Sequence, residues 1–464
     1  MNSENLQTKW GQFISLIVVF FFWGFVGSAN DILIPVFKKV FTLSQLQSQL
    51  VAWAFYAAYF VGSLIFFLIS LKSDVLQRFG YKKTLSAGLI VSAIGSLLFV
   101  PAATMESFTF FLTALFTVGL GFSIQQIVAN PLAIKMGSPA TGAHRLTLAG
   151  GLNSFGTTLG AILLGIALFG MGDNKKTNLS LEDIKLPFVI LGFTFVLVAI
   201  FMYFSKIEDP AKTDVVEAKI ENKHDKFSIL DYPQLYLGML GIFIYVGTEV
   251  TIISNLPALL HTKEFGGILE DAISPFIALY WGSLMIGRWN GGVNVFNTSN
   301  LVNTALKFIV PALAFGVIIG ANIFAAHDVS EFYIYPLWIL LFIAVSFVGG
   351  KNSSKTLMLF GISGFAMMLA GLVCTDTEIA KYFFISGGLF LSIMWPSIFD
   401  LAIAGLGKNT GKASSFLIMM ILGGGVIPLA QGAICDLDLT NPNGILSISY
   451  THFSYVVPLL GFAY

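Results

Sequence analysis

The stretch FISLIVVFFFWGFVGSANDILIPVF, residues 13–37, decides the class of fold. A helix of about 20 residues crosses the hydrocarbon core of a bilayer, and this stretch is long enough to do so. Its only ionisable side chain is Asp31, and a charge near the middle of a membrane costs about 2.5–3.5 kcal/mol on insertion scales. Such a side chain faces a cavity or a partner rather than lipid. Asp31 therefore predicts a polar pathway through a membrane protein.

The composition of the whole chain agrees with this class. Hydrophobic residues make up 56% of the sequence and charged residues 11%, whereas a soluble domain carries about 25% charged residues. Apolar runs long enough to span a membrane recur along the chain, without the alternation typical of a membrane β-barrel. We therefore predict an all-α polytopic membrane protein, in which each helix satisfies its own backbone hydrogen bonds. The zero net charge implies no nucleic-acid partner, and no cleavable signal peptide is expected.

Hydropathy divides the chain into about fourteen spans, with a polar segment after the sixth. The first six lie at about 11–36, 47–71, 84–103, 108–136, 146–170 and 187–205. The other eight lie at about 234–260, 274–290, 303–325, 333–349, 355–374, 380–406, 413–434 and 450–464. Lysine and arginine gather in the loops on the side of the N-terminus, which predicts that both termini are cytoplasmic.

Seven short strings occur in an order that is typical of one transporter family. They are FFFWGFVGSANDILIP (20–35), GLGFSIQQIVANPL (119–132), RLTLAGGLNSFG (145–156), FIYVGTEVTI (243–252), YWGSLMIGR (280–288), IMWPSIFDLAIAGLG (393–407) and SSFLIMMILGGGVIP (414–428). Over nearly the whole chain they resemble the fucose–galactose–glucose:proton symporter family of the major facilitator superfamily. The segment LKSDVLQRFGYKKTL (71–85), which contains Asp74, resembles that superfamily's loop between the second and third spans. The resemblance implies two six-helix bundles around a central sugar site and transport by alternating access.

The chain departs from this family in two respects. The family usually has twelve spans, so we interpret the surplus as an extra transmembrane hairpin at about 303–349, outside the transport path. The predicted domains are then a six-helix bundle at 1–205, a cytoplasmic linker at 206–233, and a second bundle with the inserted hairpin at 234–464. At the fourth span, proton-coupled members carry a glutamate where this chain has Gln126, and an amide cannot titrate.

Asp31 is the predicted proton-coupling residue. It follows Asn30 in the Asn-Asp pair of the family, and the resemblance makes it the protonation site. Burial disfavours the charged form of a carboxyl group and raises its pKa towards the working range. The alternative is a structural acid that is paired with a buried donor. Asn30 is a predicted sugar contact beside it.

Five further polar or aromatic side chains are predicted to contact a sugar. Gln126 and Asn130 lie four residues apart and share a helix face, and amides both donate to and accept from sugar hydroxyls. Asn153 is a further amide contact by resemblance. Glu249 is a second acid within a span, and Trp395 offers an indole that can stack on the apolar face of a sugar ring. Interhelical hydrogen bonding, a basic partner for Glu249, and ordinary packing of Trp395 remain the alternatives.

Asp74, Asp400 and Arg145 are predicted gating residues. Asp400 lies nearer the cytoplasmic end of its span, where an ion pair with Arg145 or Lys408 would form a gate. The two cysteines, Cys374 and Cys435, are interpreted as unpaired thiols, with a disulfide as the alternative. No cysteine–histidine cluster with metal spacing and no phosphate-binding glycine loop is present, so no cofactor and no enzyme activity are predicted.

These observations predict a secondary transporter that imports a hexose-type sugar together with a proton. Sodium coupling and an uncoupled facilitator stay open, because Gln126 removes one titratable group from the expected pathway. A membrane sugar sensor is the reading from a different functional class, and the short predicted linker disfavours it. The expected setting is the cytoplasmic (inner) membrane of a bacterium, as a monomer whose partners are the sugar and membrane lipid.

Overall fold

The computed structural model describes residues 7–42, 45–72, 75–169, 180–209, 228–268, 270–296, 298–350, 352–441, 444–445 and 448–464, with the side chains of some helical positions excepted. The described chain is almost entirely helical, and its only bridge between extended residues joins Ile445 and Ile448. It divides into two compact units. Unit 1 comprises Met1–Gly142, Phe155–Met239 and Ala402–Ile421; unit 2 comprises Ala143–Ser154, Leu240–Leu401 and Leu422–Tyr464. The predicted domain boundaries at 205 and 233 stay a prediction.

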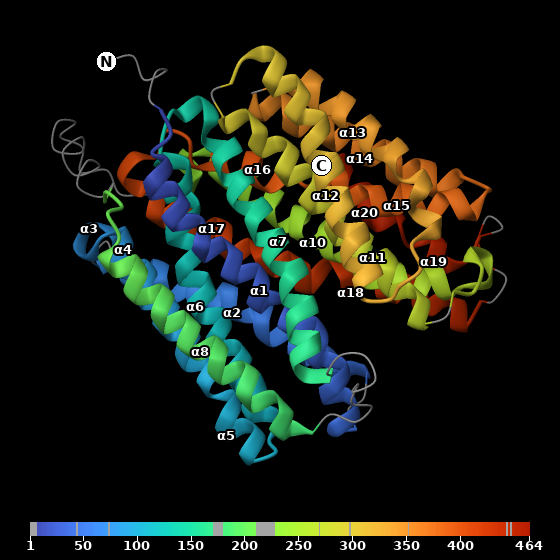
Figure 1. The fold of residues 1–464 in the computed structure, drawn as a ribbon, viewed down its shortest axis with the longest axis horizontal. Helices are drawn as coiled ribbons and strands as arrows, with labels where there is room; N and C mark the ends of the chain where they lie inside the picture. Colours follow the sequence, from blue (N-terminus) through green and yellow to red (C-terminus); the bar gives the residue numbers. More distant parts are fainter. Residues whose placement is uncertain are drawn as a thin grey trace. The chain divides into compact units, whose positions relative to one another are not determined.

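Unit 1 is built on long apolar helices. They are α1 (Trp10–Val40), α2 (Gln45–Lys72), α4 (Tyr81–Leu97), α6 (Phe108–Lys135), most of α7 (Gly142–Phe169) and α8 (Leu181–Phe204), with the short α3 (Val75–Phe79), α5 (Phe99–Thr104) and α17 (Thr410–Met419). Helix α4 lies between α6 and α8 and packs on both (Figure 1). Helix α17 packs against α2 and α6, where the rings of Phe67 and Phe416 lie 4.3 Å apart.

Small residues bring α4 and α6 into close contact. A Cβ atom added at Gly121 would lie 2.5 Å from the carbonyl oxygen of Gly88, so the two backbones nearly touch. Such contacts are the main source of helix association in lipid, where the hydrophobic effect between helices is absent. Hydrogen bonds add to them: the Trp23 indole donates to Gln125 (2.7 Å), whose amide donates to Ser92 (2.8 Å). Gln125, which is fully buried, therefore ties α1, α6 and α4 together.

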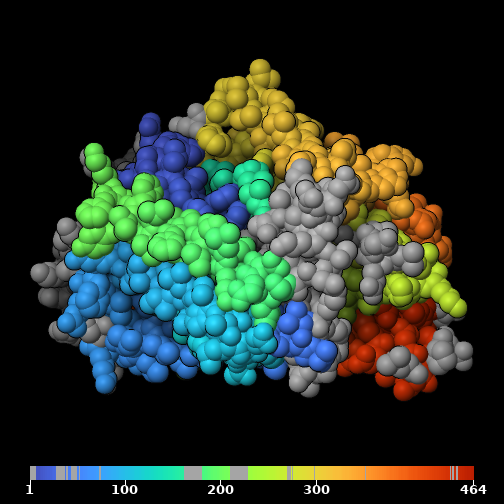
Figure 2. All heavy atoms as spheres, turned by 60° about the horizontal axis from the view of Figure 1, so that its bottom comes forward, coloured from blue at the N-terminus to red at the C-terminus, as the bar shows by residue number. Residues whose placement is uncertain are grey.

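Helix α8 shows how the outer surface is made. Its large apolar residues Leu186, Ile190, Phe193, Leu197, Phe201 and Phe204 are between 47% and 77% exposed. They are three or four residues apart and so form one stripe along the helix, which lies at the surface of unit 1 (green in Figure 2). In a soluble protein such a stripe would call for a partner; in a bilayer it faces lipid tails.

Unit 2 contains the remaining helices. They are most of α10 (Pro233–His261), then α11 (Glu270–Gly292), α12 (Asn300–Phe324), α13 (Pro336–Gly349), α14 (Ser353–Val373), α15 (Thr377–Leu391), α16 (Met394–Ile403), α18 (Gly423–Cys435), α19 (Tyr450–Phe453) and α20 (Val456–Ala463). Helix α15 ends at Leu391, and the short α16 begins at Met394, directly before Trp395 and Pro396. Cys374 and Cys435 are both free thiols.

The expectation of about fourteen spans is wrong. Eleven helices in the described part of the chain are long and apolar enough to cross a membrane. The long helices α7 and α11 are not among these eleven. The C-terminal run is not among them either, because it folds as α19 and α20, of 4 and 8 residues. Hydropathy had counted each apolar run as a span without regard to how the chain folds there.

The prediction of an extra hairpin at about 303–349 is also wrong. Helices α12 and α13 occupy this region, but they are tied into unit 2 and are not a peripheral addition. Asn290 of α11 donates to the carbonyl of Lys307 in α12 (2.8 Å). Ser283 of α11 shares a hydrogen bond of 2.6 Å with Tyr335, which directly precedes α13. Polar groups satisfied in this way belong to the packed bundle.

Replacing a glycine by alanine tests the helix packing of unit 2. A Cβ atom at Gly423 would lie 1.9 Å from the carbonyl oxygen of Phe243, a backbone atom that cannot move aside. We expect Gly423→Ala to lower the free energy of unfolding by about 1–3 kcal/mol, seen as a lower Tm in detergent. Gly316→Ala is the matched control, because open space surrounds Gly316 in α12. Equal Tm values for the two variants would contradict the close approach of α18 and α10.

Candidate functional site

A charged pair lies inside unit 2. Glu249 of α10 and Arg288 of α11 are 3.4 Å apart, measured from Oε1 to Nη2, and their side chains are 13% and 14% exposed. Glu249 was predicted from the sequence as an acid within a span. Arg288 was not singled out, although it ends the quoted string YWGSLMIGR. The structure thus supplies the basic partner that the sequence left open for Glu249.

Arg288 is held in place by groups other than the carboxylate. Its Nη1 donates to Ser154 Oγ (2.8 Å), its Nε to the carbonyl of Ser392 (3.3 Å), and its Nη2 also to the Tyr245 hydroxyl (3.5 Å). The rigid, planar guanidinium is suited to such divergent contacts. Arg288 therefore has three hydrogen-bond acceptors besides Glu249.

Aromatic rings line the same cluster. Tyr245 is one turn before Glu249 on α10, and its ring lies 6.0 Å from that of Trp395 on α16. The ring of Phe399 stacks on Trp395 at 6.2 Å. A carboxylate, a guanidinium and two amphipathic rings can bind a polyol, because they offer acceptors, donors and apolar faces together. The predicted residues Glu249 and Trp395 are thus brought together around Tyr245.

The predicted gating residues Asp400 and Arg145 also lie within electrostatic reach of each other in unit 2. Asp400 accepts a hydrogen bond from Ser353 Oγ (3.3 Å), and Arg145 is fully buried at the start of α7. Opposite charges attract strongly where water is excluded. Of the two partners expected for Asp400, the structure thus favours Arg145. The role of the pair as a gate stays a prediction.

Two predicted amides lie in unit 1. Gln126 Nε2 donates to the Tyr59 hydroxyl (3.0 Å). Asn130, one turn further along α6, is 2% exposed, and its Nδ2 has no hydrogen-bond partner among the described residues. A buried amide without a partner costs about 1–3 kcal/mol. A bound hydroxyl group would satisfy this donor, which fits the predicted sugar contact.

The other predicted residues are placed as follows. Asn30 and Asp31 belong to α1, but their side chains lie outside the described residues, and so does Asp74. Asn153 is half-buried on α7, directly before Ser154, the partner of Arg288. Within the part of the chain that the structure describes, no group of His, Cys, Asp or Glu side chains could hold a metal ion.

Comparison with known proteins identifies the family. The model of the Major Facilitator Superfamily matches residues 11–428. The chain belongs to this superfamily. It is 33% identical to a glucose/galactose transporter of Brucella abortus, over 97% of this chain and 91% of that protein. It is 31% identical to a putative glucose/galactose transporter of Helicobacter pylori, with 97% and 94% covered.

A solved structure confirms the fold. The Escherichia coli fucose:proton symporter superposes with a TM-score of 0.66 at 22% identity, over 97% of this chain and 96% of that one. The chain is therefore a membrane-spanning protein with the all-α major facilitator fold, and the resemblance proposed from its motifs is confirmed. Because nearly all of both chains superpose, the region at 303–349 is not an additional hairpin outside the common fold.

Several functional candidates were missed by sequence reasoning. Arg288, Tyr245 and Ser154 form the cluster with Glu249, yet only Arg288 carried a signal, as a charge at the end of an apolar run. A charge there is also typical of positive-inside topology, which hides its role. Tyr245 and Ser154 resemble ordinary packing residues in any membrane helix.

A double-mutant cycle tests the Glu249–Arg288 pair. We expect Glu249→Gln and Arg288→Met each to lower the free energy of unfolding, because each leaves a largely buried charge without its partner. The double variant should lose less than the sum, with a coupling energy of about 1–3 kcal/mol. Unfolding in detergent, followed by Tm and by denaturant titration, gives these values.

The matched control is the pair of Glu182 and Lys185 at the start of α8, whose carboxylate is 71% exposed. The cycle of Glu182→Gln and Lys185→Met should give a coupling energy below about 0.5 kcal/mol, because pairs three residues apart on a helix with a solvent-exposed carboxylate contribute little. Strictly additive effects at Glu249 and Arg288 would show that the two side chains do not interact in the folded protein.

Proposed function

We propose that this protein is a secondary transporter that imports a hexose-type sugar together with a proton by alternating access. The observation that carries the proposal is the cluster of Glu249, Arg288, Tyr245 and Trp395. Replacing a buried ion pair by apolar side chains is often neutral or stabilising, so a buried ion pair is weak evidence for a purely structural role. Its presence beside two aromatic rings is explained by a ligand that is rich in hydroxyl groups.

The names of the relatives support the same substrate class. The Brucella abortus and Helicobacter pylori relatives are named as transporters of glucose and galactose, and a relative in Escherichia coli, 26% identical, is named as an L-fucose-proton symporter. We propose Asn30, Gln126, Asn130, Asn153, Glu249 and Trp395 as sugar contacts. Asp74, Asp400 and Arg145 are the proposed gating residues. The proposed location is the cytoplasmic membrane of a bacterium, with both termini inside.

Proton coupling is assigned to Asp31 in this proposal. Gln126 cannot titrate, and it donates to Tyr59 as an amide does. In this scheme the protonated, neutral Asp31 permits the carrier to reorient, whereas the charged form opposes it. Alternating access would use two halves, which we propose to be the predicted bundles at 1–205 and 234–464.

Sugar binding can be tested without a membrane gradient. We expect Glu249→Gln to weaken the binding of glucose or galactose at least about tenfold, because hydrogen bonds to a charged group contribute about 1.5–3 kcal/mol. Isothermal titration of the purified protein in detergent measures this at a temperature well below the Tm of the variant. Glu182→Gln, an exposed change on α8, should leave the affinity unchanged. Equal affinities of Glu249→Gln and the parent would remove Glu249 from the binding site.

Proton coupling is tested by uptake into proteoliposomes. With an imposed proton gradient and no sodium, the parent should accumulate labelled glucose or galactose above equilibrium, and a protonophore should abolish the accumulation. Asp31→Asn should lose gradient-driven accumulation but keep saturable exchange, because it removes the titratable group and not the sugar contacts. Full accumulation by Asp31→Asn would contradict the assignment. Accumulation only after sodium is added would establish sodium symport instead, and equilibration without accumulation would establish a facilitator.

A further inference from the structure

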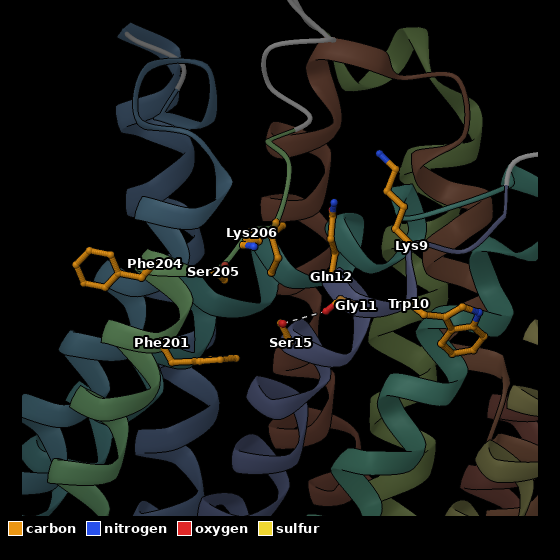
Figure 3. Close-up of a pocket in the computed structure, with 10 residues that line it drawn as sticks. Lys9, Trp10, Gly11, Gln12, Ser15, Phe201, Phe204, Ser205 and Lys206 are labelled. Atoms are coloured by element: carbon orange, nitrogen blue, oxygen red, sulfur yellow. Dashed lines mark hydrogen bonds between the residues drawn. The ribbon is translucent and has the colours of Figure 1, made fainter.

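Unit 1 has a cavity where α1 begins and α8 ends. Its volume is about 570 Å³, and Figure 3 shows its lining side chains on the first turns of α1 and the last turns of α8. The lining consists of Lys9, Trp10, Gly11, Gln12, Ser15, Phe201, Phe204, Ser205, Lys206 and Ile207. None of these residues belongs to the candidate sugar cluster, so the proposed transport function does not account for this cavity.

One cation in the cavity is left without a partner. Lys9 pairs with Glu208, and this contact holds the pKa of the Glu208 carboxyl below its usual range. Lys9 therefore already has an anionic partner. Lys82, which lies nearby, donates to the carbonyl of Ser205 (2.6 Å). Lys206 is exposed and has neither an ion pair nor a hydrogen bond within the described residues.

The apolar stripe on α8 leads into the same cavity. Leu197, Phe201 and Phe204 are 67%, 47% and 77% exposed, and the last two also line the cavity. On α1, Trp10 lines the cavity at the start of the helix, and the nearby Ile14 is 56% exposed. Tryptophan is enriched where the hydrocarbon core meets the headgroups. An acyl chain that lies along the α8 stripe would thus bring its headgroup to Lys206.

We propose that this cavity binds the headgroup of an anionic phospholipid such as phosphatidylglycerol. The ammonium of Lys206 neutralises the phosphodiester charge. The Gln12 amide nitrogen can donate to a glycerol hydroxyl and the Ser15 oxygen can accept from one, while Gln12 Oε1 accepts from Glu208 N and Ser15 Oγ donates to the Gly11 carbonyl. The stripe of Leu197, Phe201 and Phe204 takes the acyl chain. A free phosphate ion lacks this apolar half, so the continuity of stripe and cavity assigns the site to lipid.

Native mass spectrometry of the purified full chain tests this assignment. The protein is mixed with phosphatidylglycerol or with phosphatidylcholine of the same acyl chains, and the retained lipid is counted. We expect preferential retention of phosphatidylglycerol, and a loss of about fivefold in its retention by Lys206→Gln, since one lysine near an anionic surface contributes about this much. Lys206→Arg should keep the preference, because it keeps the charge.

Lys83→Gln is the matched control, because Lys83 is another exposed lysine of unit 1 that does not line the cavity. It should retain phosphatidylglycerol as the parent does. The proposal is overturned if Lys206→Gln retains as much phosphatidylglycerol as the parent, if Lys83→Gln loses as much as Lys206→Gln, or if both lipids are retained equally. Displacement of the lipid by millimolar inorganic phosphate would overturn it too, by showing a simple anion site.

Discussion

The structure depends on one constraint: a polar group placed inside a membrane must find its partner within the protein. The Arg288 guanidinium meets this constraint with four acceptors, namely Ser154, Ser392, Tyr245 and Glu249. Gln125 meets it by joining Trp23 and Ser92. The Asn130 amide has no such partner among the described residues, and we propose that a ligand hydroxyl group takes this place.

Close helix packing is what makes such partners available. Gly121 lets α6 approach the carbonyl of Gly88 on α4, which brings Gln125 within reach of Ser92. In unit 2, a Cβ atom at Gly287 would lie 1.9 Å from Ser392 Oγ, and the next residue, Arg288, donates to the Ser392 carbonyl. A larger residue at Gly121 or at Gly287 would separate the helices and move these polar groups out of hydrogen-bonding distance. Small residues and buried polar contacts in this fold therefore depend on each other.

The sequence predicted those functional residues whose chemistry is unusual in a membrane-spanning segment. Glu249 and Asp400 were visible because each is an acid in an apolar run, and Arg145, one of the two partners considered for Asp400, lies within electrostatic reach of it. Arg288 was missed because its partners are distant in the sequence. Glu249 lies 39 residues away, and Ser154 and Ser392 lie farther still. The number of spans failed for a similar reason. Hydropathy evaluates each run alone, whereas the division of the last run into α19 and α20 depends on the packed bundle.

The arrangement of the Arg288 cluster also bears on how a transporter of this kind would move. Every partner of Arg288 lies in the same compact unit, and so do Trp395 and Asp400. In alternating access one body rocks against another, and contacts within a body are kept while contacts between bodies exchange. Because Ser154 and Ser392 also bind the guanidinium, we expect it to stay in place when Glu249 changes its partner. A hydroxyl-bearing ligand that competes for Glu249 would then change the electrostatics of the unit while leaving its packing intact, which is what a carrier needs from a site that must bind and release in each cycle.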